Sequence, residues 1–267
     1  MTRRAGPWVT LGVAAALPVI GARTLRAQEK FKLVFRPPAG EALRYHDHFE
    51  MWVTVGSEQE NRPTLVMDIW RTETANTHGD TVEFVAIVDS ASALAPLGGA
   101  PPEFAEQARL MRGSREITRI TDKGRELSHE VRGITVGDVF SMLMGGRQDA
   151  EREYRQWRTM PDDSVAQGQG WDDSVSVKED SVEWRGRVTY RLRRVQQHNG
   201  VAVGRIDVAG TLHPSARDLE PERITDAVDL DVETGRLIRA DSHQYDGYVE
   251  DRVSVVFRSS WQTDRVP

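Results

Sequence analysis

The feature that most constrains the fold is a run of alternating apolar and polar residues in the segment LRYHDHFEMWVTV (43–55). Apolar side chains at every second position place Leu43, Tyr45, Phe49, Met51, Val53 and Val55 on one face. The other face carries Arg44, His46, His48, Glu50 and Thr54. Because successive side chains of a strand point to opposite faces, this period of two predicts a half-buried antiparallel strand.

Further strand-like segments occur on both sides of a middle region that has a different pattern. Further strands are predicted at 64–70, 81–89, 184–193, 201–212, 224–232, 236–245 and 252–261. The hairpins ITDKGREL (120–127) and LDVETGRLI (230–238) both place an acid two residues before a Gly-Arg pair. These hairpins favour an internal duplication into halves of about 31–133 and 160–264, joined by a helical segment. The alternative is that any β meander reuses such turns.

The middle region carries helical signals. The segment 100–112 has proline near its start and acids in its first turn, which is typical of a short helix. The segment 135–145 has an apolar stripe, and 149–157 is a polar helical segment or a linker. The sequence therefore predicts a mainly β (α+β) fold: a curved antiparallel sheet or half-barrel with two or three helices inserted mid-chain.

The first 27 residues indicate export. A basic start at Arg3 and Arg4 precedes an apolar run of thirteen residues, and small residues follow. This is the layout of a signal peptide, predicted to be cleaved after Ala27, with Ala22 as the alternative. The run is shorter than the about 20 residues of a spanning helix, although an uncleaved anchor is the competing interpretation. We expect residues 28–267 to form one β-rich domain in the periplasm or secreted space, without a stable membrane span.

Charge and cysteine content narrow the partners. Removing residues 1–27 removes four arginines and takes the formal net charge from −6 to −10. An acidic chain is repelled by phosphate groups, so we expect no nucleic-acid partner and no general attraction to anionic membranes. The chain has no cysteine, so it has neither disulfides nor thiolate metal ligands. The oligomeric state is left open by the sequence.

The pair His46 and His48 is the one metal-like feature. On a strand these side chains point the same way, about 7 Å apart, and can hold a metal if a third ligand comes from elsewhere. A metal-assisted hydrolase using these histidines is therefore one alternative function. The competing interpretation, which we favour, is a solvent-facing polar row with Arg44 and Glu50.

A row of arginines on one predicted strand is a second candidate site. Its members are Arg185, Arg187, Arg191 and Arg193. Like charges on one face repel unless they are compensated, and Asp229 and Asp231 on a later strand are candidate partners. The functional interpretation is that Arg187 and Arg191 contact an anionic ligand such as a lipid head group or an envelope polymer.

Four short segments carry a resemblance to a known family. They are PPAGEALRY (37–45), MPDDSVAQGQGW (160–171), VTYRLRRV (188–195) and DVETGRLI (231–238). Together they resemble an uncharacterised family of exported bacterial domains, which has a Pro-Gly turn before a tyrosine-bearing strand and a mid-chain Pro…Val-x-x-Gly-x-x-Trp element. That element falls here on Pro161, Val165, Gly168 and Trp171. In outline the family is similar to periplasmic lipoprotein-carrier and lipid-binding half-barrels.

These observations favour a non-enzymatic function. The chain has no nucleophile elbow and no phosphate-binding glycine loop, so neither an enzyme class nor a cofactor is predicted. We expect an exported binding or carrier-like protein for a lipid, another apolar ligand or an envelope-derived ligand, with Tyr45, Phe49 and Met51 lining the ligand site. A structural envelope protein without a ligand is a further alternative.

Overall fold

The computed structural model describes most of the chain beyond its first 28 residues. The described ranges are 29–56, 62–96, 103–136, 138–139, 159–179, 182–216, 219–250 and 253–266. The predicted signal peptide, residues 1–27, lies outside them. No helix among the described residues has both the length and the apolarity needed to cross a membrane.

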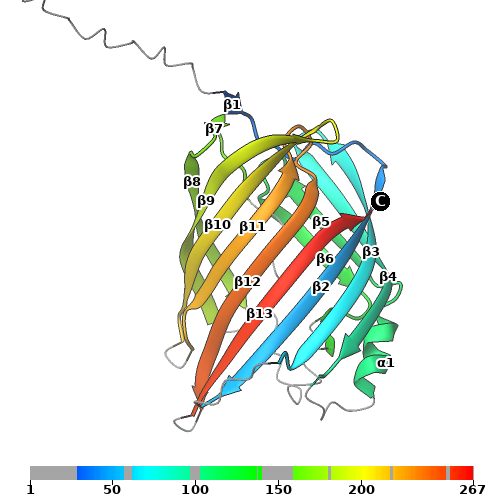
Figure 1. Cartoon of the computed structure of the whole chain (residues 1–267), viewed down its shortest axis with the longest axis vertical. Coiled ribbons are helices and arrows are strands. Elements are labelled where there is room, and N and C mark those ends of the chain that lie inside the picture. Colours follow the sequence, from blue (N-terminus) through cyan, green and yellow to red (C-terminus); the bar gives the residue numbers. More distant parts are fainter. Residues whose placement is uncertain are drawn as a thin grey trace, which may run out of the picture.

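Eleven antiparallel strands form one curved, open sheet (Figure 1). In sheet order they are β6 (Glu126–Arg132), β5 (Arg115–Thr121), β4 (Thr81–Leu94), β3 (Leu65–His78), β2 (Ala42–Val55), β13 (Val253–Val266), β12 (Leu237–Glu250), β11 (Glu222–Asp231), β10 (Val201–Pro214), β9 (Val182–His198) and β8 (Gly170–Glu179). Two meanders, β2 to β6 and β8 to β13, are joined by the pairing of β13 with β2. The expectation of a mainly β fold with a large antiparallel sheet is confirmed.

The strands are long because the alternation of side chains persists well beyond their apolar parts. In β3, buried and half-buried residues alternate from Leu65 to Asn76, although the sequence turns polar after Trp70. The predicted strand ends at Trp70, whereas β3 continues because Arg71 and Glu73 occupy the buried register. The polar segment 170–174 begins β8, which pairs with β9.

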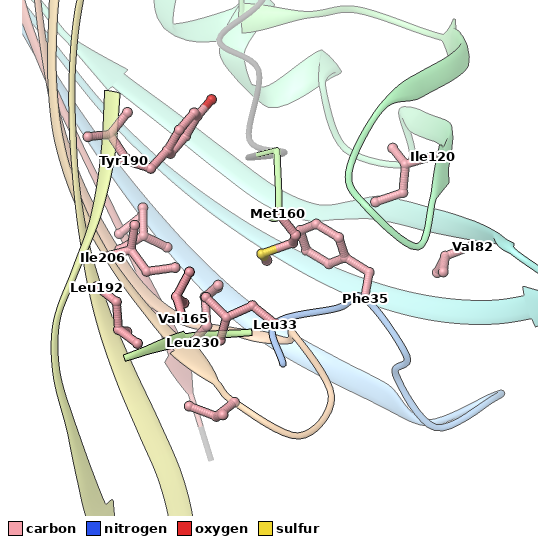
Figure 2. Close-up of a cluster of buried hydrophobic side chains, with 14 of the residues drawn as sticks. Leu33, Phe35, Val82, Ile120, Met160, Val165, Tyr190, Leu192, Ile206 and Leu230 are labelled. Atoms are coloured by element: carbon pink, nitrogen blue, oxygen red, sulfur yellow. The ribbon is translucent and has the colours of Figure 1, made fainter. Parts of the chain in front are cut away.

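The buried side chains lie on the concave face of the sheet. In Figure 2, Tyr190, Leu192 and Ile206 of the second meander face Val82 and Ile120 of the first meander, and other residues lie between the two groups. The intervening residues come from two segments outside the large sheet, 29–36 and 159–166. Within these segments β1 (Lys30–Phe31) pairs with β7 (Val165–Ala166). We call the two segments together the strap.

One helix lies wholly within the described residues, α1 (Glu103–Leu110), which contacts β4. It confirms the helix expected at 100–112. Two or three helices are not supported by the described part of the chain. The start of the predicted segment 135–145 shows a capping arrangement, in which Asp138 N donates to Thr135 Oγ1 (3.0 Å). Most of that segment, and all of 149–157, lies outside the described residues.

The packing of the concave face predicts a large cost for truncating it. Leu192 is fully buried (0% exposed), so Leu192→Ala is expected to lower the free energy of unfolding by about 2–5 kcal/mol. Leu127 on β6 is 54% exposed, and Leu127→Ala is expected to change it by less than about 0.5 kcal/mol. Urea denaturation followed by circular dichroism measures both values. Equal losses in the two variants would contradict the assignment of the core.

Candidate functional site: the concave face of the sheet

At one end of the concave face, apolar side chains from both meanders meet around the strap. Leu33 and Phe35 of the strap are 2% and 3% exposed, and Met160 and Val165 join the same cluster. The Phe35 ring meets the Phe84 ring edge to face, with centroids 6.5 Å apart. The sheet supplies the remaining members of this cluster, among them Tyr190, Leu192, Ile206, Val208, Val228 and Leu230. We call this apolar region the strap end.

The strap bridges turns that belong to opposite meanders. Phe35 N donates to Asp122 O in the β5–β6 turn, and Arg36 N donates to Thr234 O after β11, both at 2.8 Å. Met160 N donates to Lys123 O (2.8 Å), and Lys123 Nζ donates back to Pro161 O (2.7 Å). The two ends of the open sheet are therefore connected through the strap.

The short motifs behind the family resemblance converge on the strap end. Gly235 has a φ of +70°, and a Cβ placed there would lie 2.4 Å from the carbonyl oxygen of Val34, so only glycine lets the strap pass. Trp171 Nε1 donates to Thr159 O (2.7 Å), which ties β8 to the strap. Arg236 donates to Pro38 O and Glu41 O, holding the turn before β2. These motifs therefore specify how this end of the sheet is covered.

A buried ionic cluster occupies the middle of the concave face. Arg71 Nε donates to Asp47 Oδ2 (2.7 Å), and Arg71 Nη1 donates to Glu73 Oε2 (2.9 Å). All three side chains are less than 10% exposed. The guanidinium also lies over the Tyr45 ring, 4.8 Å from its centroid. A β-bulge between β3 and β4 falls at Trp70/Arg71, where the apolar register gives way to this cluster.

Burial and charge together set the ionisation of this cluster. Burial opposes the charge of Arg71, but Asp47 and Glu73 outweigh it and raise the pKa of the guanidinium. Burial also raises the pKa of Glu73, and Arg71 offsets that effect only in part. Arg71 is shared between two carboxylates, so its charge compensates the burial of Glu73 only in part.

Polar groups extend the cluster across the strands, toward both edges of the sheet. Thr263 Oγ1 of β13 donates to Asp47 Oδ1 (2.6 Å), and Ser242 of β12 donates to Asp226 of β11. On the other side, Glu116 lies 3.3 Å from His129 Nε2. Burial opposes ionisation of Glu116, but the hydrogen bond from His129 and the charge of Arg71 outweigh it and lower its pKa. We call this set of buried and half-buried polar side chains the polar band.

Beyond the polar band lies a second apolar cluster, near α1. Phe49 and Met51 of β2 pack in it with Ala108 of α1, with Met111 and with Val139. Phe49 also meets the Trp261 ring at 5.4 Å between centroids. The concave face therefore has apolar regions at both ends and fixed charges between them.

The predicted ligand-lining residues of β2 all lie on this face. Tyr45 is 1% exposed, its hydroxyl donates to Leu237 O (3.1 Å), and burial raises its pKa. Phe49 and Met51 are 8% and 2% exposed within the second apolar cluster. Their burial is accounted for by contacts within the chain, and contact with a ligand stays a prediction.

His46 and His48 lie on the opposite, outer face. His46 Nε2 and His48 Nδ1 each lie 2.9 Å from the same oxygen, Oδ1 of Asp68 on β3. The His46 ring stacks on Trp70 at 4.4 Å. Among the described residues no group of three or more His, Cys, Asp and Glu is arranged to hold a metal ion. The two histidines thus share a carboxylate, and a metal role for them stays a prediction.

Arg187 and Arg191 also lie on the outer face, on β9. Arg187 Nη2 lies 3.6 Å from Asp172 of β8, and Arg191 Nε donates to Gly168 O (3.0 Å). Arg193 pairs with Asp207 of β10. The expected partners Asp229 and Asp231 are used elsewhere: Asp229 binds Arg205, and Asp231 accepts hydrogen bonds within its own turn. Acids of neighbouring strands therefore pair with Arg187 and Arg193, but they are not the acids that were expected, and contact of Arg187 and Arg191 with an anionic ligand stays a prediction.

The polar band is the feature that sequence reasoning missed. Asp47 stands in the apolar register of β2 between Tyr45 and Phe49, and Arg71 and Glu73 continue the register of Leu65, Met67 and Ile69. Charged residues at buried positions of two neighbouring strands were the available signal. Their pairing depends on the register between strands, which cannot be read from a single sequence.

Comparisons with known proteins add little to this geometry. No protein-family model matches the chain, and neither does any curated protein. Among solved structures the chain is similar to that of a presumed exported protein with a YmcC-like fold from Bacteroides fragilis. The two are 8% identical with a TM-score of 0.27, over 85% of this chain and 96% of the other. This similarity is too low to assign a fold or a function to the chain.

The ionic cluster predicts a strong effect of removing its cation. Arg71→Met leaves Asp47 and Glu73 buried without a counter-charge and is expected to lower the free energy of unfolding by about 3–5 kcal/mol. Arg132→Met, which removes an exposed pair with Glu130, is expected to cost about 0–1 kcal/mol. Chemical denaturation at pH 7 measures both. Adding Asp47→Asn and Glu73→Gln to Arg71→Met should recover part of the loss, and equal costs for the two single variants would refute the cluster's role.

The shared carboxylate predicts a pH-dependent stability. The hydrogen bond to Asp68 raises the pKa of His48 despite an opposing effect of burial, and Glu50 adds to the rise. The stabilising contribution of His48 is therefore fully present below its unfolded pKa of about 6.5 and is lost as the pH rises through its folded pKa. The stability difference between the natural chain and Asp68→Asn should therefore shrink as the pH rises from below about 6.5 to well above it.

Thermal unfolding across that range measures the difference. The control is Asp207→Asn, which removes a partner of Arg193 instead of a histidine partner. The loss of stability caused by Asp207→Asn should be the same at every pH in this range. An Asp68→Asn cost that is equally independent of pH would rule out the histidine linkage.

Proposed function

We propose that the protein is an exported, non-enzymatic binding or carrier-like protein whose sheet acts as a half-barrel for an apolar or amphipathic cell-envelope ligand. The observation that carries the proposal is the composition of the concave face. It holds two apolar clusters separated by the polar band. An apolar chain fits the clusters, whereas fixed charges suit the polar part of the same molecule.

The open sheet supports this function physically. An antiparallel sheet that does not close leaves its concave face to be covered by other material. Here the strap covers one end and α1 the other, so among the described residues the cover consists of short segments. Short covering segments can be exchanged for a ligand at lower cost than strands of the sheet can.

The predicted signal peptide supports export. Its removal takes away four arginines, so the formal net charge is −10 for the predicted mature chain and −6 for the whole sequence. The metal-assisted hydrolase is less well supported, because His46 and His48 bind Asp68 on the outer face, away from the concave face. We therefore keep the hydrolase and the ligand-free structural protein as outcomes of the test.

Binding of a fluorescent hexadecanoic acid to the purified mature protein tests the proposal. We expect saturable binding. Phe49→Leu should weaken it by roughly 5-fold, because loss of about 1 kcal/mol of apolar contact has that effect. Trp70→Leu also replaces an aromatic side chain by a smaller aliphatic one, but on the outer face, and should leave the affinity unchanged.

Native mass spectrometry of the same preparation separates the alternatives. A co-purified lipid supports the carrier. A stoichiometric metal that is lost in a His46→Ala/His48→Ala variant supports the hydrolase. The absence of both, together with no binding of the fatty acid, supports a structural protein and refutes the proposal.

A further inference from the structure

The strap is attached to the sheet by much weaker means than the strands are attached to one another. The large sheet is joined by long ladders, such as the pairing of β2 with β13 from Arg44 to Val55. In contrast, β1 and β7 pair over two residues each. The first strap segment is held to the flanking turns by the bonds of Phe35 and Arg36 and by an exposed ion pair of Arg36 with Asp122 (3.6 Å).

The second strap segment is held by hydrogen bonds of Thr159, Met160 and Pro161, and apolar side chains of both segments add to this attachment. Leu33, Phe35, Met160 and Val165 insert into the strap end between the two meanders (Figure 2). They contact a surface that is itself apolar, formed by residues such as Ile206 and Leu230. Apolar contacts are not directional, so another apolar chain can fill the space of these four side chains, while the hydrogen bonds of the strap to the exposed turns pass to water.

The bounds of the strap are suited to movement. The first segment ends at Pro37 and Pro38, followed by Gly40 with a φ of +73°. The second ends at the turn of Gly168, whose φ is +84° and whose amide donates to Leu192 O (2.6 Å). Changes of backbone angle at such loop positions can swing a segment without disturbing the strands that follow.

We propose that the strap is a displaceable cover over the ligand surface, and that the acyl or other apolar chain of a ligand takes the place of Leu33, Phe35, Met160 and Val165. This inference rests on the proposed function. The ligand and the strap then compete for one surface, so the covered state is the empty state of the carrier. Release of the strap exposes the strap end and permits entry, whereas closure shields apolar surface from water.

Hydrogen exchange of the natural chain tests the weak attachment without any ligand. The amides of Phe35, Arg36 and Met160 should exchange at least about 100-fold faster than that of Val208 in the middle of β10, since a weakly held segment opens without global unfolding. Exchange of these strap amides at the rate of Val208 would show that the strap opens only when the sheet unfolds, and would overturn the proposal.

Cross-linking tests the competition directly. The chain contains no cysteine, so an Arg36→Cys/Asp122→Cys variant offers only the two introduced thiols to a short bis-maleimide. These side chains approach each other across the strap and the β5–β6 turn. We expect the cross-linked form to bind fluorescent hexadecanoic acid at least about 10-fold more weakly or more slowly than the same variant before cross-linking.

The control is His198→Cys/Val201→Cys, which links paired residues of the β9–β10 hairpin outside the strap end. Cross-linking there should leave binding unchanged. Unchanged binding after cross-linking of the strap would overturn the proposal while leaving the carrier function intact. If the natural chain does not bind the fatty acid at all, the proposed function fails, and hydrogen exchange alone decides whether the strap opens.

Discussion

The physical constraint on which the structure depends is the need to cover the concave face of an open sheet. Eleven antiparallel strands satisfy their own backbone hydrogen bonds, but a curved sheet that ends at β6 and β8 cannot bury its apolar face against itself. The strap and α1 provide that cover at the two ends. The glycine at 235 and the tryptophan at 171 follow from this constraint, because both serve the docking of the strap.

The polar band divides the concave face and gives it a defined register. A charged cluster such as Asp47–Arg71–Glu73 is costly to bury unless each group is paired. A slip of β3 by one residue would carry Arg71 to the outer face and leave Asp47 buried alone. The band therefore favours one pairing of β2, β3 and β13, and it separates the two apolar clusters.

The sequence predicted the type of structure well and its details less well. Alternation around Tyr45 and Phe49 indicated the strand and its buried face, because periodicity is a local property of the chain. The length of β3 was underestimated because Arg71 and Glu73 are polar, and only tertiary pairing makes them inward residues. The strap was not predicted at all, since Leu33 and Phe35 follow a predicted leader and pack against turns almost 90 and 200 residues away. For the candidate site, the face of Tyr45, Phe49 and Met51 was predictable, whereas Asp47 and Arg71 required the register between strands.

The central claim, that the concave face takes up an apolar ligand, is tested most directly by methyl nuclear magnetic resonance with a nitroxide-labelled fatty acid. We expect the label to broaden methyl signals of concave residues such as Ile206, Leu230 and Leu65, and to spare those of the outer-face residues Ile117 and Ile87. Broadening restricted to outer-face methyls, or no broadening at saturating fatty acid, would contradict it.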